Sequence, residues 1–410
     1  MKKNLGVLFS VFLLLGGGVK AVNVKAESAN ESVGVYERIE KSVMVGTQNA
    51  DANLQIHAKS AYLMDFDSKT PVFASNELQR LPIASMCKIM TLLLSFEAID
   101  NGIISLDEEV MISERASSMG GSQVFLESNA KYPVKELIKS IVVCSANDSC
   151  VALAEKIAGN ESAFTDRMNE RAKQLGANNT LFANCTGLPK EPQYSCAQDV
   201  AIMLKELLSH KEYYEYGKVW MDKFVHPKGR YTEITNTNKL VRFYDGCDGG
   251  KTGFTNQAGF CLAATAKRDN TRVISVVIGE ENSKTRFDDV RAMFDYAFAN
   301  YTTKTIVQAN IPLEKQAQIN GGKQKFVAVT PVRNACVFVK KGEKQNIKIE
   351  TEYNSLSAPL NKGDCVGELI VYKDNIEIDK IPLVAQTSVE KATLLDRMKD
   401  IANDWNARKK

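Results

Sequence analysis

The sequence is poor in the residues that build metal centres. Only three histidines occur in 410 residues, His57, His210 and His226, and none stands at a metal-ligand spacing from another. Zinc sites are usually built from histidine and cysteine at short, regular spacings. A zinc site is therefore not expected, and no cofactor is expected either.

The sequence also lacks the paired cysteines of a disulfide framework. Its nine cysteines are odd in number, contain no CxxC pair and are spread thinly from Cys87 to Cys365. Several stand in apolar stretches, where a free cysteine behaves as a small hydrophobic residue. Most are interpreted as reduced packing residues, and a single Cys144–Cys150 or Cys185–Cys196 bridge is left open.

No apolar run is long enough to cross a bilayer, which takes about 20 residues. The run Leu5–Leu15 follows Lys2 and Lys3 and precedes small-residue cleavage patterns that end at Ala21 and Ala26. This arrangement is typical of a secretory signal peptide rather than a retained anchor. The prediction is a signal over residues 1–26, cleaved after Ala26, and an exported protein.

An excess of charge of one sign is absent as well. The chain has 52 basic and 49 acidic residues, and loss of residues 1–26 removes four lysines and no acid, which leaves 48 and 49. Basic residues interleaved with aromatic ones, as in nucleic-acid-binding surfaces, are not found. A nucleic-acid partner is therefore excluded.

The remaining composition is that of an ordinary globular protein with room for two or three domains. After a polar lead-in over 27–54, residues 55–301 mix strand and helix patterns. Residues 302–387 alternate in short strands with glycine- and lysine-bearing turns and predict a small all-β domain. Strands are expected at 259–266 and 272–279 and around the turn at 65–69; helices are expected at 164–175, 197–209 and 284–301.

The last segment, 388–410, has the pattern of an amphipathic helix. Leu394, Met398, Ile401 and Trp405 fall on one helical face, and charged residues occupy the rest. Such a helix can lie in a membrane interface. The alternative is a helix that packs on its own or a partner protein.

The most informative stretch is Pro82–Thr91, in which Ser85 stands three residues before Lys88 at the start of the apolar run Ile89–Phe96. Residues three apart share a helical face, so the hydroxyl and the amine can approach each other. A lysine whose pKa is lowered by desolvation can activate a serine as a nucleophile. The pattern predicts such a pair on a buried helix.

Two further motifs follow in order. Ser145-Ala146-Asn147 interrupts an apolar helical pattern over 134–157, where a helix cap would be the simpler interpretation. Lys251-Thr252-Gly253 stands in a glycine-rich stretch just before the predicted strands. Glycines there would let the backbone approach a ligand closely.

With these three motifs the chain resembles the D-alanyl-D-alanine carboxypeptidases, the low-molecular-mass penicillin-binding proteins. Residues 84–91, 145–148, 182–189, 236–238 and 248–259 are similar to blocks of that family. The resemblance is strong over about 55–300 and looser beyond. It implies an α+β protein with a β-lactamase/transpeptidase-like domain, in which helices flank an antiparallel sheet beside a helical subdomain, followed by the small β domain and the terminal helix.

Three positions depart from the family pattern. Cys87 stands where a threonine is usual, Gln193 where a histidine often precedes Tyr-Ser, and Gly250 where an apolar residue is commoner. Neither Gln193 nor Gly250 is a residue to which the resemblance assigns chemistry, so activity is expected to survive both of these departures.

The resemblance implies a reaction centre made of four side chains. Ser85 would attack the carbonyl between two terminal D-alanines with Lys88 as general base, and form an acyl-enzyme. Ser145 would relay a proton to the leaving amine with help from Lys251. The charge of Lys251 would also depress the pKa of Lys88 and attract the substrate carboxylate.

The same resemblance implies a substrate-binding set. Asn147 would hold the peptide amide, and the backbone N–H groups of Ser85 and Phe254 would form an oxyanion hole worth on the order of 3 kcal/mol per donor. Thr252 and Arg286 would bind the terminal carboxylate, with Lys251 and Gly253 on the same strand.

The implied function is removal of the terminal D-alanine from peptidoglycan stem peptides, with β-lactams as covalent inhibitors, at the outer face of the cytoplasmic membrane or in the cell-wall space. A serine β-lactamase shares the motifs, but no Glu-x-x-x-Asn loop stands between Ser145 and Lys251. A DD-endopeptidase would use the same residues. A catalytically silent wall-binding scaffold is the alternative from another class, disfavoured because Ser85, Lys88, Ser145, Asn147 and Lys251 are all present.

Overall fold

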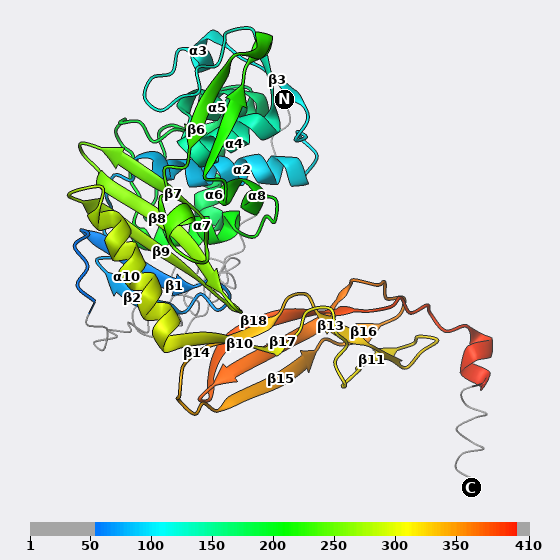
Figure 1. The fold of residues 1–410 in the computed structure, drawn as a ribbon. Coiled ribbons are helices and arrows are strands. Elements are labelled where there is room, and N and C mark those ends of the chain that lie inside the picture. Colours follow the sequence, from blue (N-terminus) through cyan, green and yellow to red (C-terminus); the bar gives the residue numbers. More distant parts are fainter. Residues whose placement is uncertain (1–53, 400–410) are drawn as a thin grey trace, which may run out of the picture. The chain divides into compact units, whose positions relative to one another are not determined.

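The structure, a computed structural model, describes residues 54–399 (Figure 1). The export signal predicted over 1–26 lies outside these residues. So do 27–53 of the predicted lead-in and 400–410 of the predicted terminal helix.

A five-stranded antiparallel sheet, in the order β2-β1-β9-β8-β7, forms the centre of the first domain. Every residue of β9 is buried, as expected for the middle strand of a sheet that is covered on both faces. The predicted turn at 65–69 joins β1 to β2, and the predicted strand pair 259–266 and 272–279 is found as β8 and β9. The strands are β1 (Ser60–Asp65), β2 (Pro71–Ser75), β7 (Cys247–Thr255), β8 (Gly259–Arg268) and β9 (Thr271–Glu280).

Helices cover both faces of this sheet. Helix α10 packs its Val290, Met293 and Phe294 on one face, and α7 packs on the other (Figure 1). Their apolar residues recur every three to four positions, which gives each helix one buried stripe. The predicted helices at 164–175, 197–209 and 284–301 are confirmed to within three residues at each end. The helices are η1 (Ala84–Cys87), α2 (Lys88–Asp100), α3 (Glu114–Ser117), α4 (Val134–Cys144), α5 (Asn147–Ala158), α6 (Glu161–Gln174), α7 (Ala197–Leu207), α8 (Tyr213–Gly217), η2 (Pro227–Gly229), α9 (Leu240–Phe243) and α10 (Thr285–Asn300).

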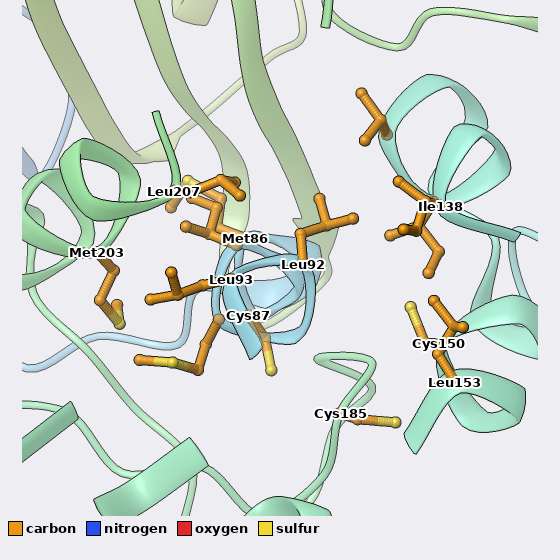
Figure 2. Packing of buried hydrophobic residues seen from close by; sticks show 14 of the residues in the cluster. Met86, Cys87, Leu92, Leu93, Ile138, Cys150, Leu153, Cys185, Met203 and Leu207 are labelled. Atoms are coloured by element: carbon orange, nitrogen blue, oxygen red, sulfur yellow. The ribbon is translucent and has the colours of Figure 1, made fainter. Parts of the chain in front are cut away.

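Helix α2 lies in the middle of the main core. Figure 2 shows Met203 and Leu207 of α7 on one side of it, and Ile138 of α4 with Leu153 of α5 on the other. Because α2 is apolar on nearly all sides, it can be stable only where other elements surround it. The helix that begins at Lys88 is therefore rigidly enclosed.

The apolar pattern over 134–157 forms two helices, α4 and α5, separated at Ser145. Ser145 has a left-handed backbone with φ 66° and ends α4, while Asn147 begins α5. Two short hairpins complete the helical subdomain: β3 (Glu109–Met111) with β4 (Lys131–Pro133), and β5 (Met221–Val225) with β6 (Tyr231–Thr235).

Residues from Tyr301 onward form a separate set of small sheets, as predicted for an all-β domain. Alternate residues such as Leu369, Val371, Ile381 and Leu383 face its own core. The sheets pair β10-β14, β12-β11-β16 and β13-β18-β17-β15. The strands are β10 (Tyr301–Val307), β11 (Ala317–Asn320), β12 (Phe326–Val327), β13 (Val329–Pro331), β14 (Ala335–Lys340), β15 (Ile347–Tyr353), β16 (Leu356–Ser357), β17 (Cys365–Lys373) and β18 (Ile376–Ala385).

After this domain, residues 394–399 are helical, with the side chains of Leu394, Leu395 and Met398 exposed by 76%, 69% and 59%. Among the described residues, 54–399, no helix combines the length and apolar character needed to cross a bilayer.

All nine cysteines lie within the described residues, and all are unpaired thiols. Seven are buried, Cys144 is half-buried and Cys365 is exposed. Burial raises the pKa of the Cys87, Cys144 and Cys150 thiols, which keeps them neutral.

Candidate active site

The nucleophile candidate Ser85 stands in a short 3₁₀ turn that leads directly into α2. Lys88 is the first residue of that helix, and its Nζ lies 2.9 Å from Ser85 Oγ. A spacing of three residues brings side chains together in a 3₁₀ turn as it does in an α-helix, because three residues complete one 3₁₀ turn. The predicted contact is present, although the turn and not α2 itself carries the serine.

The nucleophile turn is held between two backbones that approach it closely. A Cβ atom on Gly187 would come within 2.0 Å of the Ala84 carbonyl oxygen, and one on Gly253 within 2.6 Å of the Ile83 carbonyl oxygen. Only glycine fits such approaches. Gly253 therefore lets β7 lie against the nucleophile turn, a reason distinct from the ligand approach that the sequence suggested.

Lys88 and Lys251 are both buried, with exposed fractions of 0% and 1%. Lys88 Nζ donates to the Thr186 carbonyl oxygen at 2.6 Å, and Lys251 Nζ donates to the Thr252 carbonyl oxygen at 3.0 Å. Burial lowers the pKa of each amine, since the charged form loses its hydration. Burial therefore favours the neutral form of both amines.

The two buried amines are coupled through their charges. Burial is the main cause of the lowered pKa of Lys88, and the positive charge of Lys88 adds to burial in lowering the pKa of Lys251 well below its ordinary value. Because repulsion between two cations is mutual, a protonated Lys251 favours the neutral form of Lys88 in the same way. Lys88 has two acceptors for its ammonium, Ser85 Oγ and the Thr186 carbonyl, and Lys251 has one. Lys251 is the less well stabilised cation until an anion binds.

Ser145 and Asn147 line the junction between α4 and α5. Ser145 Oγ is buried and has no hydrogen-bond partner among the described residues. Asn147 Nδ2 donates to the Gly120 carbonyl oxygen at 2.7 Å, which leaves Oδ1 buried and without a partner. An unpaired buried acceptor is costly and is often satisfied by a ligand. No hydrogen bond joins either side chain to the other predicted site residues within 54–399.

The remaining predicted residues lie on or beside β7. Thr252 Oγ1 donates to Thr237 Oγ1 at 2.8 Å. The Phe254 ring is 51% exposed and packs on Phe260. Arg286 of α10 is 9% exposed and donates to the Gly253 carbonyl oxygen at 3.3 Å, with its Nε unpaired.

Three residues that sequence reasoning did not select support this site. Thr186 contributes a carbonyl oxygen, which no side-chain pattern could indicate. Thr237 lies inside a block that was noted but given no role. Tyr213, interpreted from the sequence as packing, accepts from the Gly250 N–H at 2.9 Å beneath the strand that carries Lys251.

The three departures from the family pattern find local explanations. Cys87 Sγ donates to the Asn184 carbonyl oxygen, and Gln193 accepts from the Ala183 N–H and donates to the Leu188 carbonyl oxygen. Gly250 has φ 130°, and a Cβ there would meet the Ala263 carbonyl oxygen at 2.3 Å. Cys87 and Gln193 thus hold backbone segments around the site by hydrogen bonds, and Gly250 lets β7 lie close to the backbone of β8.

Comparisons with known proteins identify the family of this chain. Residues 46–282 match the family described as D-alanyl-D-alanine carboxypeptidase, and residues 301–391 match the C-terminal domain of penicillin-binding protein 5. The chain is 40% identical over 356 residues to the D-alanyl-D-alanine carboxypeptidase DacF of Bacillus subtilis, an alignment that covers 86% of this chain and 91% of that protein.

Solved structures give the same result. Penicillin-binding protein 5 of Haemophilus influenzae superposes with a TM-score of 0.67 at 31% identity, over 82% of this chain and 98% of its own. Penicillin-binding protein D2 of Listeria monocytogenes, in its ampicillin-bound form, superposes with a TM-score of 0.54 at 29% identity, over 60% and 99%. The chain therefore belongs to the D-alanyl-D-alanine carboxypeptidase family of serine peptidases.

Proposed function

We propose that Ser85 is the residue acylated when this serine-type carboxypeptidase removes the terminal D-alanine of a peptidoglycan stem peptide. The observation that carries the assignment is the 2.9 Å contact between Ser85 Oγ and the fully buried Lys88 Nζ. Ser85 is itself half-buried, so a substrate can reach its hydroxyl. The enzyme acts on peptidoglycan, in the cell-wall space.

Lys88 acts as the general base. Burial lowers its pKa, so the amine can be neutral and take the Ser85 proton as Oγ attacks the carbonyl between the two D-alanines. The tetrahedral intermediate collapses to a Ser85 ester when the leaving D-alanine amine receives a proton. Ser145, whose hydroxyl has no partner among the described residues, relays that proton with Lys251, and water later hydrolyses the ester.

The oxyanion is bound by the backbone N–H groups of Ser85 and Phe254. The close approach of Gly253 to the nucleophile turn supports this assignment, because a Cβ there would lie 3.2 Å from Ser85 N. Each preorganised donor of this kind is worth on the order of 3 kcal/mol in the transition state.

The substrate is held at both ends. Thr252 and the unpaired Arg286 Nε bind the terminal carboxylate, with Lys251 as the nearby cation. That carboxylate also raises the pKa of Lys251 and so restores the cation that burial disfavours. On the other side of the scissile bond, the free Asn147 Oδ1 accepts the peptide N–H.

The domain plan of the proposal follows the sequence boundaries: a signal at 1–26, a lead-in at 27–54, the enzyme at 55–301, the β domain at 302–387 and a membrane-associating helix at 388–410. Exposed Leu394, Leu395 and Met398 support the last of these, since isolated apolar side chains on a charged helix can insert into a membrane interface. The enzyme is thereby held at the outer face of the cytoplasmic membrane.

The test of the acyl-enzyme is the intact mass of residues 27–410, followed over time after penicillin is added. A long-lived adduct that maps to Ser85, together with D-alanine release from a pentapeptide, is the expected result. An adduct that disappears quickly while hydrolysed drug accumulates would indicate a β-lactamase instead. No adduct would overturn the role of Ser85.

The test of the membrane helix compares vesicle binding of residues 27–410 with that of residues 27–387. The longer protein is expected to sediment with anionic vesicles and the shorter one to stay in solution. Equal sedimentation of both would contradict the assignment.

A further inference from the structure

A pocket of about 200 Å³ lies between α3, the start of α6 and the loop at 184–190. Three charged side chains line it, Arg115, Glu161 and Lys190. Its other lining residues are Met119, Asn184, Thr186, Leu188 and Pro189. None of the roles proposed above uses this pocket.

The pocket adjoins the reaction centre at two points. Thr186 lines it and also accepts the hydrogen bond of Lys88 Nζ through its carbonyl oxygen. Met119 lines it and precedes Gly120, whose carbonyl oxygen binds Asn147 Nδ2. The segments that hold Lys88 and Asn147 in place therefore also line the pocket, which puts it close to the acyl side of a peptide bound by Ser85 and Asn147.

The loop that forms one wall is built to stay in place. Asn184 Oδ1 accepts from the N–H groups of Thr186 and Gly187, and Asn184 Nδ2 donates to the Leu188 carbonyl oxygen. Gly187 in turn packs against the Ala84 carbonyl. A wall held by the nucleophile turn keeps a fixed distance from the reacting atoms, as a specificity pocket requires.

The charges of the pocket are not balanced. Arg115 Nη2 lies 3.1 Å from Glu161 Oε2, so these two neutralise each other. Lys190 makes no ion pair or hydrogen bond with any other residue of 54–399. The pocket therefore carries one exposed cation that no residue of 54–399 neutralises, beside an arginine, and this charge favours a ligand with one negative group.

We propose that this pocket binds a carboxylate on the acyl side of the stem peptide and selects substrates by it, with Lys190 and Arg115 as its specificity-determining residues. This inference rests on the proposed function, because the acyl side is defined by attack of Ser85. Glu161 has an opposing role: it occupies Arg115 and sets how strongly the carboxylate is preferred.

The experiment uses residues 27–410 and two matched peptides, N-acetyl-L-2-aminoadipyl-D-Ala-D-Ala and its side-chain amide. The readout is the ratio of kcat/KM for D-alanine release from the carboxylate peptide to that from the amide peptide. Lys190→Gln and Arg115→Gln are each expected to lower this ratio roughly tenfold, the effect of losing one charge-assisted contact. Glu161→Gln is expected to raise it.

Lys173→Gln is the matched control, because it removes an exposed cation from α6 outside the pocket and should leave the ratio unchanged. A ratio that is near one in the unaltered enzyme, or that all three pocket variants leave unaltered, would overturn the inference. Failure of the proposed function would look different: neither peptide would release D-alanine, and penicillin would leave no adduct on Ser85.

Discussion

Two buried clusters of ionisable residues lie on elements of the same domain, and each contains a group whose pKa is shifted by burial. One is the cation pair Lys88 and Lys251, whose amines have lowered pKa values because of burial. The other is the carboxyl pair Glu280, at the end of β9, and Asp289, on α10; burial first, and then Asp289, raise the pKa of Glu280 to about 7. In both clusters, burial favours the neutral form.

The difference lies in what each cluster faces. The lysine pair lies beside half-buried Ser85, so a neutral amine has a hydroxyl to deprotonate. The carboxyl pair faces His57, which donates to Asp289 from its backbone N–H and pairs with it through Nδ1 at 3.0 Å. The Thr285 hydroxyl near Glu280 donates to the Asn282 carbonyl oxygen, and no serine or cysteine side chain of 54–399 hydrogen-bonds to the pair. A shifted pKa therefore marks burial in both places, and only the neighbouring nucleophile marks function.

The strongest test of this comparison is Ser85→Ala. It removes the nucleophile and leaves both lysines buried, so D-alanine release should fall by roughly a thousandfold or more while the fold is retained. The measurement is D-alanine release from a pentapeptide, with circular dichroism as the check on folding. Normal turnover in a folded variant would separate the lysine pair from the chemistry altogether.

Lys251→Gln should have the next largest effect. Loss of the cation that serves the substrate carboxylate and the leaving group is expected to lower kcat/KM by about a hundredfold. The pH dependence of the remaining activity should change as well. Lys88 acts as a base only when it is neutral, and a neighbouring cation lowers its pKa. Without Lys251, Lys88 should hold its proton to higher pH, so the acid limb of the pH–rate profile should move upward.

Lys267→Gln, on exposed β8 surface, is the control for a general change of charge. If the acid limb of Lys251→Gln coincides with that of the unaltered enzyme, the two amines are not coupled, and the proposed division of roles between them fails.

Much of this site could be predicted from the sequence because its chemistry depends on local spacing. Ser85 and Lys88 are three residues apart, and the apolar run after them predicted the burial that lowers the Lys88 pKa. Contacts between distant segments left no such signal. The Thr186 carbonyl that holds Lys88 is 98 residues away in sequence, and its hydrogen bond involves no side chain of that residue.

The fold also divides into features set by local sequence patterns, which could be predicted, and contacts between distant segments, which could not. The strands at 259–266 and 272–279 and the helix at 284–301 were predicted from periodicity, because each buries one regular face or lies wholly inside. The pairing of β1 with β9, by contrast, joins residues more than 200 positions apart. The charged pocket also escaped prediction, since Arg115, Glu161 and Lys190 come from three separate elements.

Glu280→Gln tests the other half of the comparison, where an effect on stability and not on catalysis is expected. The folded pKa of about 7 lies above the ordinary value of 4.5, so Glu280 supports the fold fully below about pH 4.5 and loses that contribution as pH rises through 7. The neutral glutamine should remove this loss and stabilise the protein at pH 8 by about 2 to 3 kcal/mol relative to the unaltered chain.

Urea unfolding at pH 5 and pH 8 measures this difference, and Glu281→Gln, the exposed neighbour, is the control. Parallel stability curves for Glu280→Gln and the unaltered chain would mean that Glu280 titrates normally. Burial would then shift the pKa in the lysine cluster and not in the carboxyl cluster.

Tyr213→Phe should have the smallest effect, and it asks whether the lysine pair depends on its supporting strand as much as on burial. The Tyr213 hydroxyl is the acceptor for the buried Gly250 N–H, one residue before Lys251. Phenylalanine keeps the ring against Gly249 but leaves that N–H without a partner, at a cost of about 1 to 2 kcal/mol in the free energy of unfolding. Tyr216→Phe is the control, because the Tyr216 hydroxyl makes no hydrogen bond with another residue of 54–399. This substitution should change the free energy of unfolding little. If Tyr213→Phe lowers kcat/KM without lowering stability, the hydroxyl positions Lys251 directly; if it lowers stability alone, burial suffices to hold the lysine pair.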